Sequence, residues 1–528
     1  MSATPAFWNK RIETLPEIVD QAAVEAASVC LHFDRPLDAF PDRGCSLTYA
    51  EAAACGRRLA AGLYLAGVRR GDRVAIIKCN HFDTYLLTYA VMRIGGVPAL
   101  ISPELEPAAA RELLEILDRP VLVTDPTVCT TKALQGIPLV DVSRLALSVG
   151  GDVGGAAELE TNAPDAPITN SYEPDAPALI THTSGTTSLP KLAVQSHRTL
   201  AANWAMVSAW CKLLRVKETI GIHLAFPHIR VVTGITSMLL MRWSLVALTD
   251  PTPSNVDAVF AEYRPGVIET FPNTFILWEQ LLCSSTRPLS SARWFLSTFD
   301  AMHPRTLQAL LDGSSRRGAG YAQMYGQTET GPITARIYTR RLAGHADSRC
   351  VGHAFPAFSR FRIAPPTASN GNPHSGGDIL VQSRALVLNY LGRESHYDSN
   401  FREGWWRMTD VGHRSRWGCL HLHDREIDKT TSIASLLALE DRLFDRIPGI
   451  VEGVLVPMEG GELTPVVCTR DDTPLDLGQW SAAVADLPTM AAPRHCRWED
   501  LPHTATWKVR RVETRRLVER GELLTVAT

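Results

Sequence analysis

The chain has 528 residues, a formal net charge of −3 and 45% hydrophobic residues, which is the composition of an ordinary globular enzyme with room for at least two domains. So weak a charge provides no field that would favour nucleic acid or an anionic membrane as a partner. No apolar run reaches membrane-spanning length, residues 1–10 lack the pattern of a secretion signal, and the 11 cysteines include no C-x-x-C pair. We therefore expect a cytoplasmic protein with reduced thiols.

Helices and strands alternate in the first part of the chain. Thr48 and Glu51 have the spacing of a capping box, and an apolar-periodic helix is predicted to follow them. Residues 74–77 and 97–101 have the pattern of buried strands on either side of a helix over 83–93. The same alternation continues to about residue 330, and it indicates an α/β fold with a mainly parallel sheet.

Short strands separated by turns follow residue 340, for example at 360–363 and 378–381, and they predict a small β-rich subdomain. A compact α+β segment ends the chain. We expect an N-terminal adenylate- and substrate-binding domain over 1–423, a hinge at 424–428 and a mobile C-terminal domain over 429–528.

A polar loop over residues 181–191 lies between two predicted strands, 178–180 and 192–194. Four hydroxyl side chains surround Gly185, and the loop ends in a Pro-Lys pair. Glycine lets the backbone approach a phosphate, hydroxyls donate hydrogen bonds and Lys191 neutralises charge, so the pattern favours phosphate binding. Its spacing is not that of the Walker loop.

This loop resembles the Thr-Ser-Gly-Thr-Thr-Gly-x-Pro-Lys signature of the adenylate-forming superfamily, which includes acyl-CoA ligases, peptide-synthetase adenylation domains and luciferases. Residues 325–329 resemble the Tyr-Gly-x-Thr-Glu motif of that family, and residues 404–412 resemble its Gly-Trp-x-x-Thr-Gly-Asp-x-Gly motif. Residues 501–511 resemble its C-terminal Leu-Pro-x-Thr-x-x-Gly-Lys-Ile/Val-x-Arg motif. The resemblance runs from Leu47 to Arg511 and implies the acyl-CoA synthetase fold.

The resemblance also implies roles for single residues. Thr328 would contact a nucleotide phosphate, and Glu329 would hold Mg²⁺. Asp410 would accept both ribose hydroxyls, and Arg425 at the hinge would contact ribose or phosphate. Lys508 would be the catalytic lysine, whose ammonium stabilises the transition state of attack on the α-phosphate. The implied nucleotide-binding residues are Thr183, Ser184, Gly185, Thr186, Thr187, Lys191, Asp300, Tyr325, Gly326, Asp410 and Arg425.

In this family an acid and ATP give acyl-AMP and pyrophosphate, and a thiol then attacks the acyl carbonyl. The resemblance therefore implies ATP or AMP (as the acyl-adenylate), Mg²⁺ and coenzyme A as ligands. Large side chains between residues 200 and 300 favour an apolar cyclic or aromatic acid, although they also have the pattern of an ordinary core. The candidate pocket residues are Trp204, Trp210, His228, Arg230, Phe271, Pro272, Trp278 and Phe299.

The chain departs from the family pattern around the nucleotide. Ser188 replaces the second glycine of the loop, and residues 297–301 replace a Gly-Gly-Ala segment. Met408 and Thr409 precede the ribose-binding aspartate in place of Thr-Gly, and Trp507 replaces the glycine before the catalytic lysine. These departures predict a thioester-forming enzyme whose adenylation is weak or lost, supplied with an acyl-adenylate by a separate adenylating enzyme.

Three alternatives stay open. The chain could be a complete ATP-dependent acyl-CoA ligase, or it could load an acyl group onto a carrier protein, although no carrier motif follows Arg511. It could also be a nucleotide-binding pseudoenzyme. Only 8 lysines occur among 53 basic residues, and the presence of Lys191 and Lys508 within motifs argues against that last alternative.

Each motif also has a purely structural interpretation. Residues 325–329 have the pattern of a capped helix start, and Asp410 that of a turn residue before a glycine. Cys419, His421 and His423 alternate onto one face of a predicted strand. They favour a polar sheet face over a zinc site.

Overall fold

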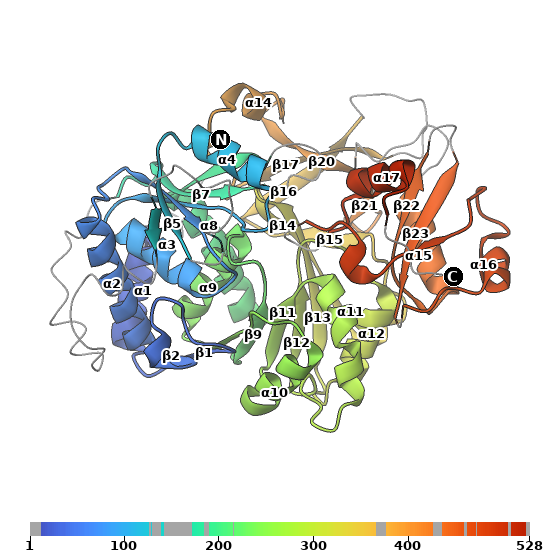
Figure 1. The fold of residues 1–528 in the computed structure, drawn as a ribbon, viewed down its shortest axis with the longest axis horizontal. Helices are drawn as coiled ribbons and strands as arrows, with labels where there is room; N and C mark the ends of the chain where they lie inside the picture. Colours follow the sequence, from blue (N-terminus) through green and yellow to red (C-terminus); the bar gives the residue numbers. More distant parts are fainter. Residues whose placement is uncertain are drawn as a thin grey trace.

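The computed structural model has the layered α/β architecture that the sequence predicts, with two large sheets and a separate small one (Figure 1). The structure describes residues 12–125, 128, 139–141, 172–183, 190–214, 216–365, 376–425, 436–458, 462–470, 472–504 and 508–523.

The first large sheet has seven strands in the order β18-β8-β7-β4-β3-β5-β6. Strands β3 to β7 run parallel, and β8 and β18 are antiparallel additions at one edge. The strands are β3 (Arg73–Ile77), β4 (Val97–Leu100), β5 (Val121–Thr124), β6 (Leu139–Asp141), β7 (Pro177–His182), β8 (Leu192–Ser196) and β18 (Asn389–Tyr390).

The second large sheet has 14 strands and joins a parallel half to an antiparallel half. The parallel half comprises β1 (Cys30–Phe33), β9 (Ile220–His223), β10 (Leu245–Ala247), β11 (Val267–Thr270), β12 (Trp294–Ser297) and β13 (Gly320–Gln327), with β2 (Ser46–Thr48) antiparallel at its edge. The antiparallel half comprises β14 (Gly331–Thr339), β15 (Cys350–Ala354), β16 (Ser359–Ala364), β17 (Gly377–Ser383), β19 (Phe401–Arg402), β20 (Trp405–Arg414) and β21 (Leu420–Arg425).

Five helices fill the space between the two large sheets: α1 (Leu15–Glu25), α2 (Tyr49–Leu65), α3 (Asp83–Arg93), α8 (His197–Leu213) and α9 (Ile229–Met241). Their buried side chains belong to one hydrophobic cluster, which also contains Ile76 from the first sheet and Ile222 and Leu245 from the second. Helices apolar on several sides are expected in such a middle layer, because a sheet covers them on both sides.

Other helices cover the outer faces. Leu113 and Leu114 pack against the far face of the seven-stranded sheet. Phe260, Trp278 and Leu310 pack against the far face of the 14-stranded sheet. The outer helices are α4 (Pro107–Ile116), α10 (Pro253–Tyr263), α11 (Pro272–Trp278), α12 (Pro304–Gly313), α13 (Arg340–Ala343) and α14 (Glu394–Asp398).

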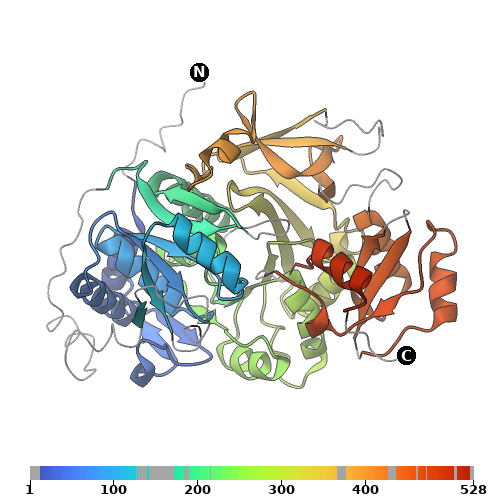
Figure 2. The ribbon, with the colours of Figure 1, turned by 45° about the horizontal axis from the view of Figure 1, so that its top comes forward.

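Residues 436–523 form hydrophobic clusters of their own around a three-stranded sheet. This part comprises α15 (Leu436–Arg446), β22 (Ile450–Pro457), β23 (Leu463–Thr469), α16 (Leu477–Val484), β24 (Arg494–His495) and α17 (Arg511–Arg520). Figure 2 shows these red elements on the opposite side of the molecule from the blue N-terminal helices. Polar contacts join them to the body, among them the ion pair of Arg470 with Glu279, at 2.7 Å.

Two structural predictions from the sequence are confirmed in detail. Thr48 and Glu51 form both hydrogen bonds of a capping box at the start of α2. Helix α3 has the predicted bounds. Two other interpretations are wrong. Residues 325–327 end strand β13 and Thr328 and Glu329 lie in the turn after it, so the motif does not start a helix. Asp410 lies inside the ten-residue strand β20 and not in a turn.

Candidate active site

The base of the hydroxyl-rich loop is an antiparallel pair of strands, β7 and β8. The Thr183 N–H donates to the Lys191 carbonyl at 3.0 Å, and the Lys191 N–H donates to the Thr183 hydroxyl at 3.1 Å. These two bonds fix Lys191 at the exit of the loop. The predicted phosphate-binding residues Ser184, Gly185, Thr186 and Thr187, and with them Ser188, lie outside the described residues.

Lys191 lies beside a glutamate and a tyrosine. Its ammonium nitrogen is 5.2 Å from the centre of the Tyr390 ring, and the Tyr390 hydroxyl donates to the Glu329 carboxylate. Burial raises the pKa of Glu329, against the opposing effects of the Tyr390 hydrogen bond and the Lys191 charge. A carboxylate is the protein ligand that a Mg²⁺–phosphate group requires, and Glu329 lies beside the predicted phosphate-binding loop, so these residues fit the implied metal.

The turn that carries Thr328 and Glu329 is clamped to its surroundings. The Gln195 amide of β8 donates to the Thr328 carbonyl at 3.3 Å. A Cβ at Gly326 would lie 2.1 Å from the Gly331 carbonyl oxygen, so only glycine permits this close approach of β13 and β14. The motif therefore shapes a tight strand-to-strand turn at the edge of the loop.

Tyr325 and Asp410 link two of the predicted motifs. The Tyr325 hydroxyl donates to an Asp410 carboxylate oxygen at 2.7 Å. In the ladder of β20 and β21, Asp410 is paired with Arg425, so the backbone brings the predicted ribose-binding and hinge residues side by side. The side chain of Arg425 lies outside the described part of the chain.

Two histidines, His182 and His228, have pKa values that burial lowers. His182 donates from Nδ1 to the Thr183 carbonyl at 2.9 Å and accepts the Ser102 N–H at Nε2 at 3.0 Å. Burial lowers the pKa of His228 to about 3, with further effects of His182, Lys508 and Arg230. Lys508 comes from the C-terminal part, and its charge adds to the lowering of the His228 pKa.

Phe299 adopts a conformation that glycine favours, with φ of 83°. Its ring packs edge-on against His228, with centroids 4.6 Å apart. The neighbouring carboxylate of Asp300 accepts the Ala301 N–H at 2.9 Å. Burial raises the pKa of Glu452 in the C-terminal part to about 8, and the charge of Asp300 adds to this effect. The segment that replaces Gly-Gly-Ala therefore keeps a glycine-like backbone with an aromatic side chain.

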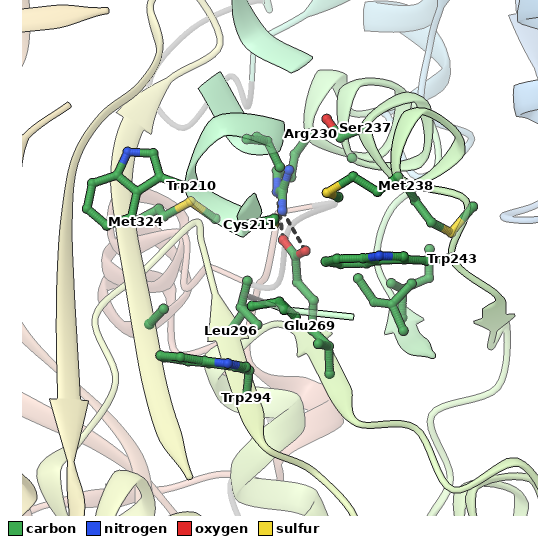
Figure 3. A pocket seen from close by; sticks show the side chains of 18 of the residues that line it. Trp210, Cys211, Arg230, Ser237, Met238, Trp243, Glu269, Trp294, Leu296 and Met324 are labelled. Carbon is green, nitrogen blue, oxygen red and sulfur yellow. Dashed lines mark hydrogen bonds and ion pairs between the residues drawn. The ribbon is translucent and has the colours of Figure 1, made fainter. Parts of the chain in front are cut away.

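A large cavity lies between α8, α9 and the parallel half of the 14-stranded sheet (Figure 3). It has about 1030 Å³ of empty space, part of it open to solvent, and its walls are almost entirely apolar. Trp210, Trp243 and Trp294 line it together with Met238 and Met324. An ion pair between Arg230 and Glu269 projects into it.

Only part of the predicted pocket lines this cavity. Trp210 and Arg230 do line it, whereas Trp204 on α8 and Phe271, which directly follows β11, belong to the hydrophobic core between the sheets. Pro272 and Trp278 lie on α11, and the buried Trp278 packs on the outer face of the sheet, while Phe299 contacts His228. Sequence reasoning missed Glu269, which reads as one polar residue in a short buried strand.

The residues considered for zinc have separate partners. The Cys419 sulfur is 3.6 Å from His353, His421 lies 3.0 Å from Asp347, and His423 lies 2.7 Å from His413. Within the described part of the chain, no cluster of three histidine, cysteine or carboxylate side chains has the geometry for a metal ion. The interpretation as a polar sheet face is therefore the better one.

Fold and site together are those of an adenylate-forming enzyme. The family model for AMP-binding enzymes matches residues 19–391. The chain therefore belongs to this family, the adenylate-forming superfamily. None of the helices among the described residues combines the length and hydropathy needed to span a bilayer.

Relatives of known function differ in the reaction that their names state. The chain is 39% identical over 531 residues to the 3-amino-2-hydroxy-4-methoxybenzoate diazotase of Streptomyces cremeus, with 95% of each chain covered. It is 28% identical to the indoleacetate–CoA ligase of Aromatoleum aromaticum, covering 91% of this chain and 94% of the relative. It is 27% identical to a feruloyl-CoA synthase of Amycolatopsis, covering 90% and 94%.

Solved structures share the fold at low identity. ATP-bound MatB from Rhodopseudomonas palustris has a TM-score of 0.76 and 21% identity, and covers 97% of this chain and 100% of its own. The O-succinylbenzoate coenzyme A synthetase from Bacillus subtilis, in complex with ATP and magnesium, has a TM-score of 0.75 and 20% identity, covering 94% and 98%. Both support the fold assignment.

Proposed function

We propose that this enzyme is an ATP-dependent diazotase that activates nitrite as an adenylate and transfers its nitrogen to an aromatic amine. The observation that carries the proposal is the 39% identity, over 95% of both chains, to a relative named as a benzoate diazotase. The indoleacetate–CoA ligase is 28% identical in sequence to this chain. The tryptophan-lined cavity next to α9 supports an aromatic substrate.

The proposed reaction uses the chemistry of the family with a different acid. A nitrite oxygen attacks the α-phosphate of ATP, a P–O bond forms, and pyrophosphate leaves. The amine nitrogen of the arene then attacks the nitrogen of the nitrosyl adenylate, the N–O bond breaks, and AMP leaves. The resulting N-nitrosamine takes up a proton and loses water to give the diazonium group. No external oxidant or reductant is needed, because nitrite already has the required oxidation level.

Residues of this chain have defined parts in the proposal. Lys191 and Lys508 would neutralise the two anions that meet in the first step, and Glu329 would hold the Mg²⁺ of the bound nucleotide. His228 stays neutral at physiological pH, since its pKa is about 3. A neutral imidazole beside the reacting groups does not protonate the amine, which must keep its lone pair to attack.

An isotope experiment tests the proposal. The enzyme is supplied with ATP, 3-amino-2-hydroxybenzoate and [¹⁸O]nitrite, and the AMP that forms is analysed by mass spectrometry. We expect one ¹⁸O in the AMP phosphate, because the N–O bond breaks and the oxygen stays on phosphorus. Unlabelled AMP, or the absence of any nitrite-dependent AMP, would contradict the proposal.

The second candidate is an acid–thiol ligase that forms an acyl-CoA, with coenzyme A or a carrier thiol as acceptor. The relatives named indoleacetate–CoA ligase and feruloyl-CoA synthase support it. In that reaction ¹⁸O from the carboxylate, and not from nitrite, would appear in AMP, and AMP release would require CoA.

The departures from the nucleotide motifs bear on both candidates. The diazotase proposal requires that adenylation is retained, whereas Ser188 and Trp507, which lie outside the described residues, predicted from the sequence that it is weak or lost and that the adenylate is made elsewhere. Pyrophosphate exchange into ATP, measured with nitrite and separately with aromatic acids, decides this point. Brisk exchange with either acid would show that adenylation is retained.

A further inference from the structure

The ion pair in the cavity is buried and well formed. Arg230 Nε and Nη2 each donate to one Glu269 oxygen at 2.7 Å, and the two residues are 8% and 2% exposed. Figure 3 shows the pair projecting into the cavity between the walls that carry Trp210 and Trp243. The pair satisfies one edge of the guanidinium only, since all of its hydrogen bonds come from Nε and Nη2.

The other edge is left without a partner. Arg230 Nη1 is buried and has no hydrogen-bond partner among the described residues. The indole nitrogen of Trp294, which lines the cavity from β12, is also buried with no hydrogen-bond partner in the part of the chain that the structure describes. Buried donors are nearly always paired, and leaving one unpaired costs about 1–3 kcal/mol. Two unpaired donors on one cavity indicate that an acceptor of the ligand completes them.

Nη1 lies close to Gly234 on α9, where no side chain crowds it. Gly234 follows one turn later on α9, and a Cβ there would lie 3.3 Å from Nη1. The Ser237 hydroxyl on the same helix donates to the Thr233 carbonyl at 2.7 Å. Arg230 and Gly234 both line the cavity, so this edge of the guanidinium lies at the cavity wall.

The charge of the pair limits which acceptor can enter. Arg230 and Glu269 neutralise each other, so a carboxylate placed on Nη1 would leave a net buried negative charge close to Glu269. A neutral oxygen on an aromatic ring avoids this cost. A ring hydroxyl can accept from Nη1 and donate to a second lone pair of Glu269, whereas a methoxy oxygen can only accept.

We propose that Arg230 and Glu269 are a specificity-determining pair that recognises a neutral oxygen substituent, preferably a hydroxyl, on the ring of the aromatic substrate. This inference rests on the proposed function for the identity of the arene as an aromatic amine. His228 and Arg230 stand two residues apart at the start of α9. A substrate ring bound through its oxygen substituent at Arg230 would therefore leave its other substituents toward the groups around His228.

Binding measured without nucleotide or nitrite tests the pair independently of the reaction. The probes are 3-aminobenzoate and its 2-hydroxy, 4-hydroxy and 2-methoxy derivatives, titrated into the full-length enzyme by calorimetry. For the wild type we expect a hydroxy derivative to bind about 10- to 100-fold more tightly than 3-aminobenzoate, with the methoxy derivative in between. Equal affinity for all four probes would overturn the inference.

Substitution of Arg230 and Glu269 tests whether this pair causes the preference for the hydroxyl group. Arg230→Met alone leaves a buried carboxylate unpaired and can unfold the protein, so the main variant is Arg230→Met with Glu269→Leu. We expect it to lose the preference for hydroxyl, measured as the ratio of its affinities for the hydroxy derivatives and for 3-aminobenzoate. Arg316→Met, which removes an exposed ion pair with Glu218, is the matched control and should keep the preference.

The outcomes separate the inference from the proposed function. A hydroxyl preference that survives in the double variant would overturn the role of the pair, whatever reaction the enzyme catalyses. A preference that is lost there, in an enzyme that puts no nitrite oxygen into AMP, would support the pair and contradict the diazotase proposal.

Discussion

The role of the Lys508 charge can be tested directly by substitution. Lys508 belongs to the C-terminal part, and its charge adds to the effect of burial in lowering the pKa of His228. We predict that Lys508→Met lowers the rate of adenylate formation about 10²- to 10³-fold, because a positioned cation for the developing charge is lost. Stopped-flow or quench measurement of pyrophosphate release checks this. Lys212→Met, at an exposed position near the end of α8, is the control and should leave the rate unchanged.

The Tyr390 hydroxyl controls the charge state of Glu329. Its hydrogen bond lowers the pKa of a carboxyl that burial raises. In Tyr390→Phe the ionised form loses this donor, so the pKa of Glu329 rises further. If Glu329 must be ionised to hold Mg²⁺, the acidic limb of the pH–rate profile moves to higher pH. Tyr397→Phe removes a neighbouring hydroxyl that bonds the Val387 carbonyl, and it should leave that limb in place.

At the scale of single elements, the start of α2 provides a stability test. Thr48 accepts the Glu51 N–H at 3.2 Å, and the Glu51 carboxylate accepts the Thr48 N–H at 2.8 Å. We predict that Thr48→Ala lowers the free energy of unfolding by about 1 kcal/mol, as is usual for loss of an N-cap. Urea denaturation measures the change. Thr48→Ser should restore most of it, and an unchanged midpoint for Thr48→Ala would contradict the prediction.

Local signals in the sequence predicted local structure. The capping box at Thr48 and the helix over 83–93 depend on residues a few positions apart, so the chain itself displays them. The position of Asp410 inside β20 was missed, because a glycine two residues later resembles a turn and only the pairing with β17 and β21 overrides it. Where a short segment is compatible with either a turn or a strand, tertiary contacts decide which of the two it forms.

The residues that line the cavity could be predicted from the sequence only in part. Arg230 was singled out, but its partner Glu269 lies 39 residues away, and nothing in a strand of sequence Val-Ile-Glu-Thr marks the glutamate as part of a site. Trp204 and Trp210 share a helix and a residue type, yet only Trp210 lines the cavity. Which face of α8 meets the core and which meets the cavity is decided by the sheets on either side.

At the scale of the whole molecule, the contact between the body and the C-terminal part contains a pH-sensitive carboxyl. Asp441 on α15 accepts the Ser348 hydroxyl at 2.9 Å and lies 3.9 Å from Arg349, with Asp347 and Glu440 nearby. Burial raises the pKa of Asp441 to about 6, and Ser348 and Arg349 only partly offset that effect. The contact therefore favours the protonated acid.

The strength of this contact depends on pH, because Asp441 has a different pKa when the two parts touch and when they are separated. In the separated state Asp441 has an ordinary pKa near 3.8, and in the contact it has about 6. Between these two pKa values the separated state loses its proton while the contact state keeps it. The free energy of the contact therefore becomes less favourable as pH rises to about 6, and it is constant above that pH.

We predict that the radius of gyration from X-ray scattering increases between pH 4.5 and 6.5. Asp441→Asn, which cannot ionise, should stay compact throughout, because its contact carries no charge at any pH. Asp486→Asn removes an exposed partner of Arg446 in the same part of the chain and should behave as the wild type. A pH-independent radius for the wild type would mean that Asp441 does not control how these two parts of the enzyme meet.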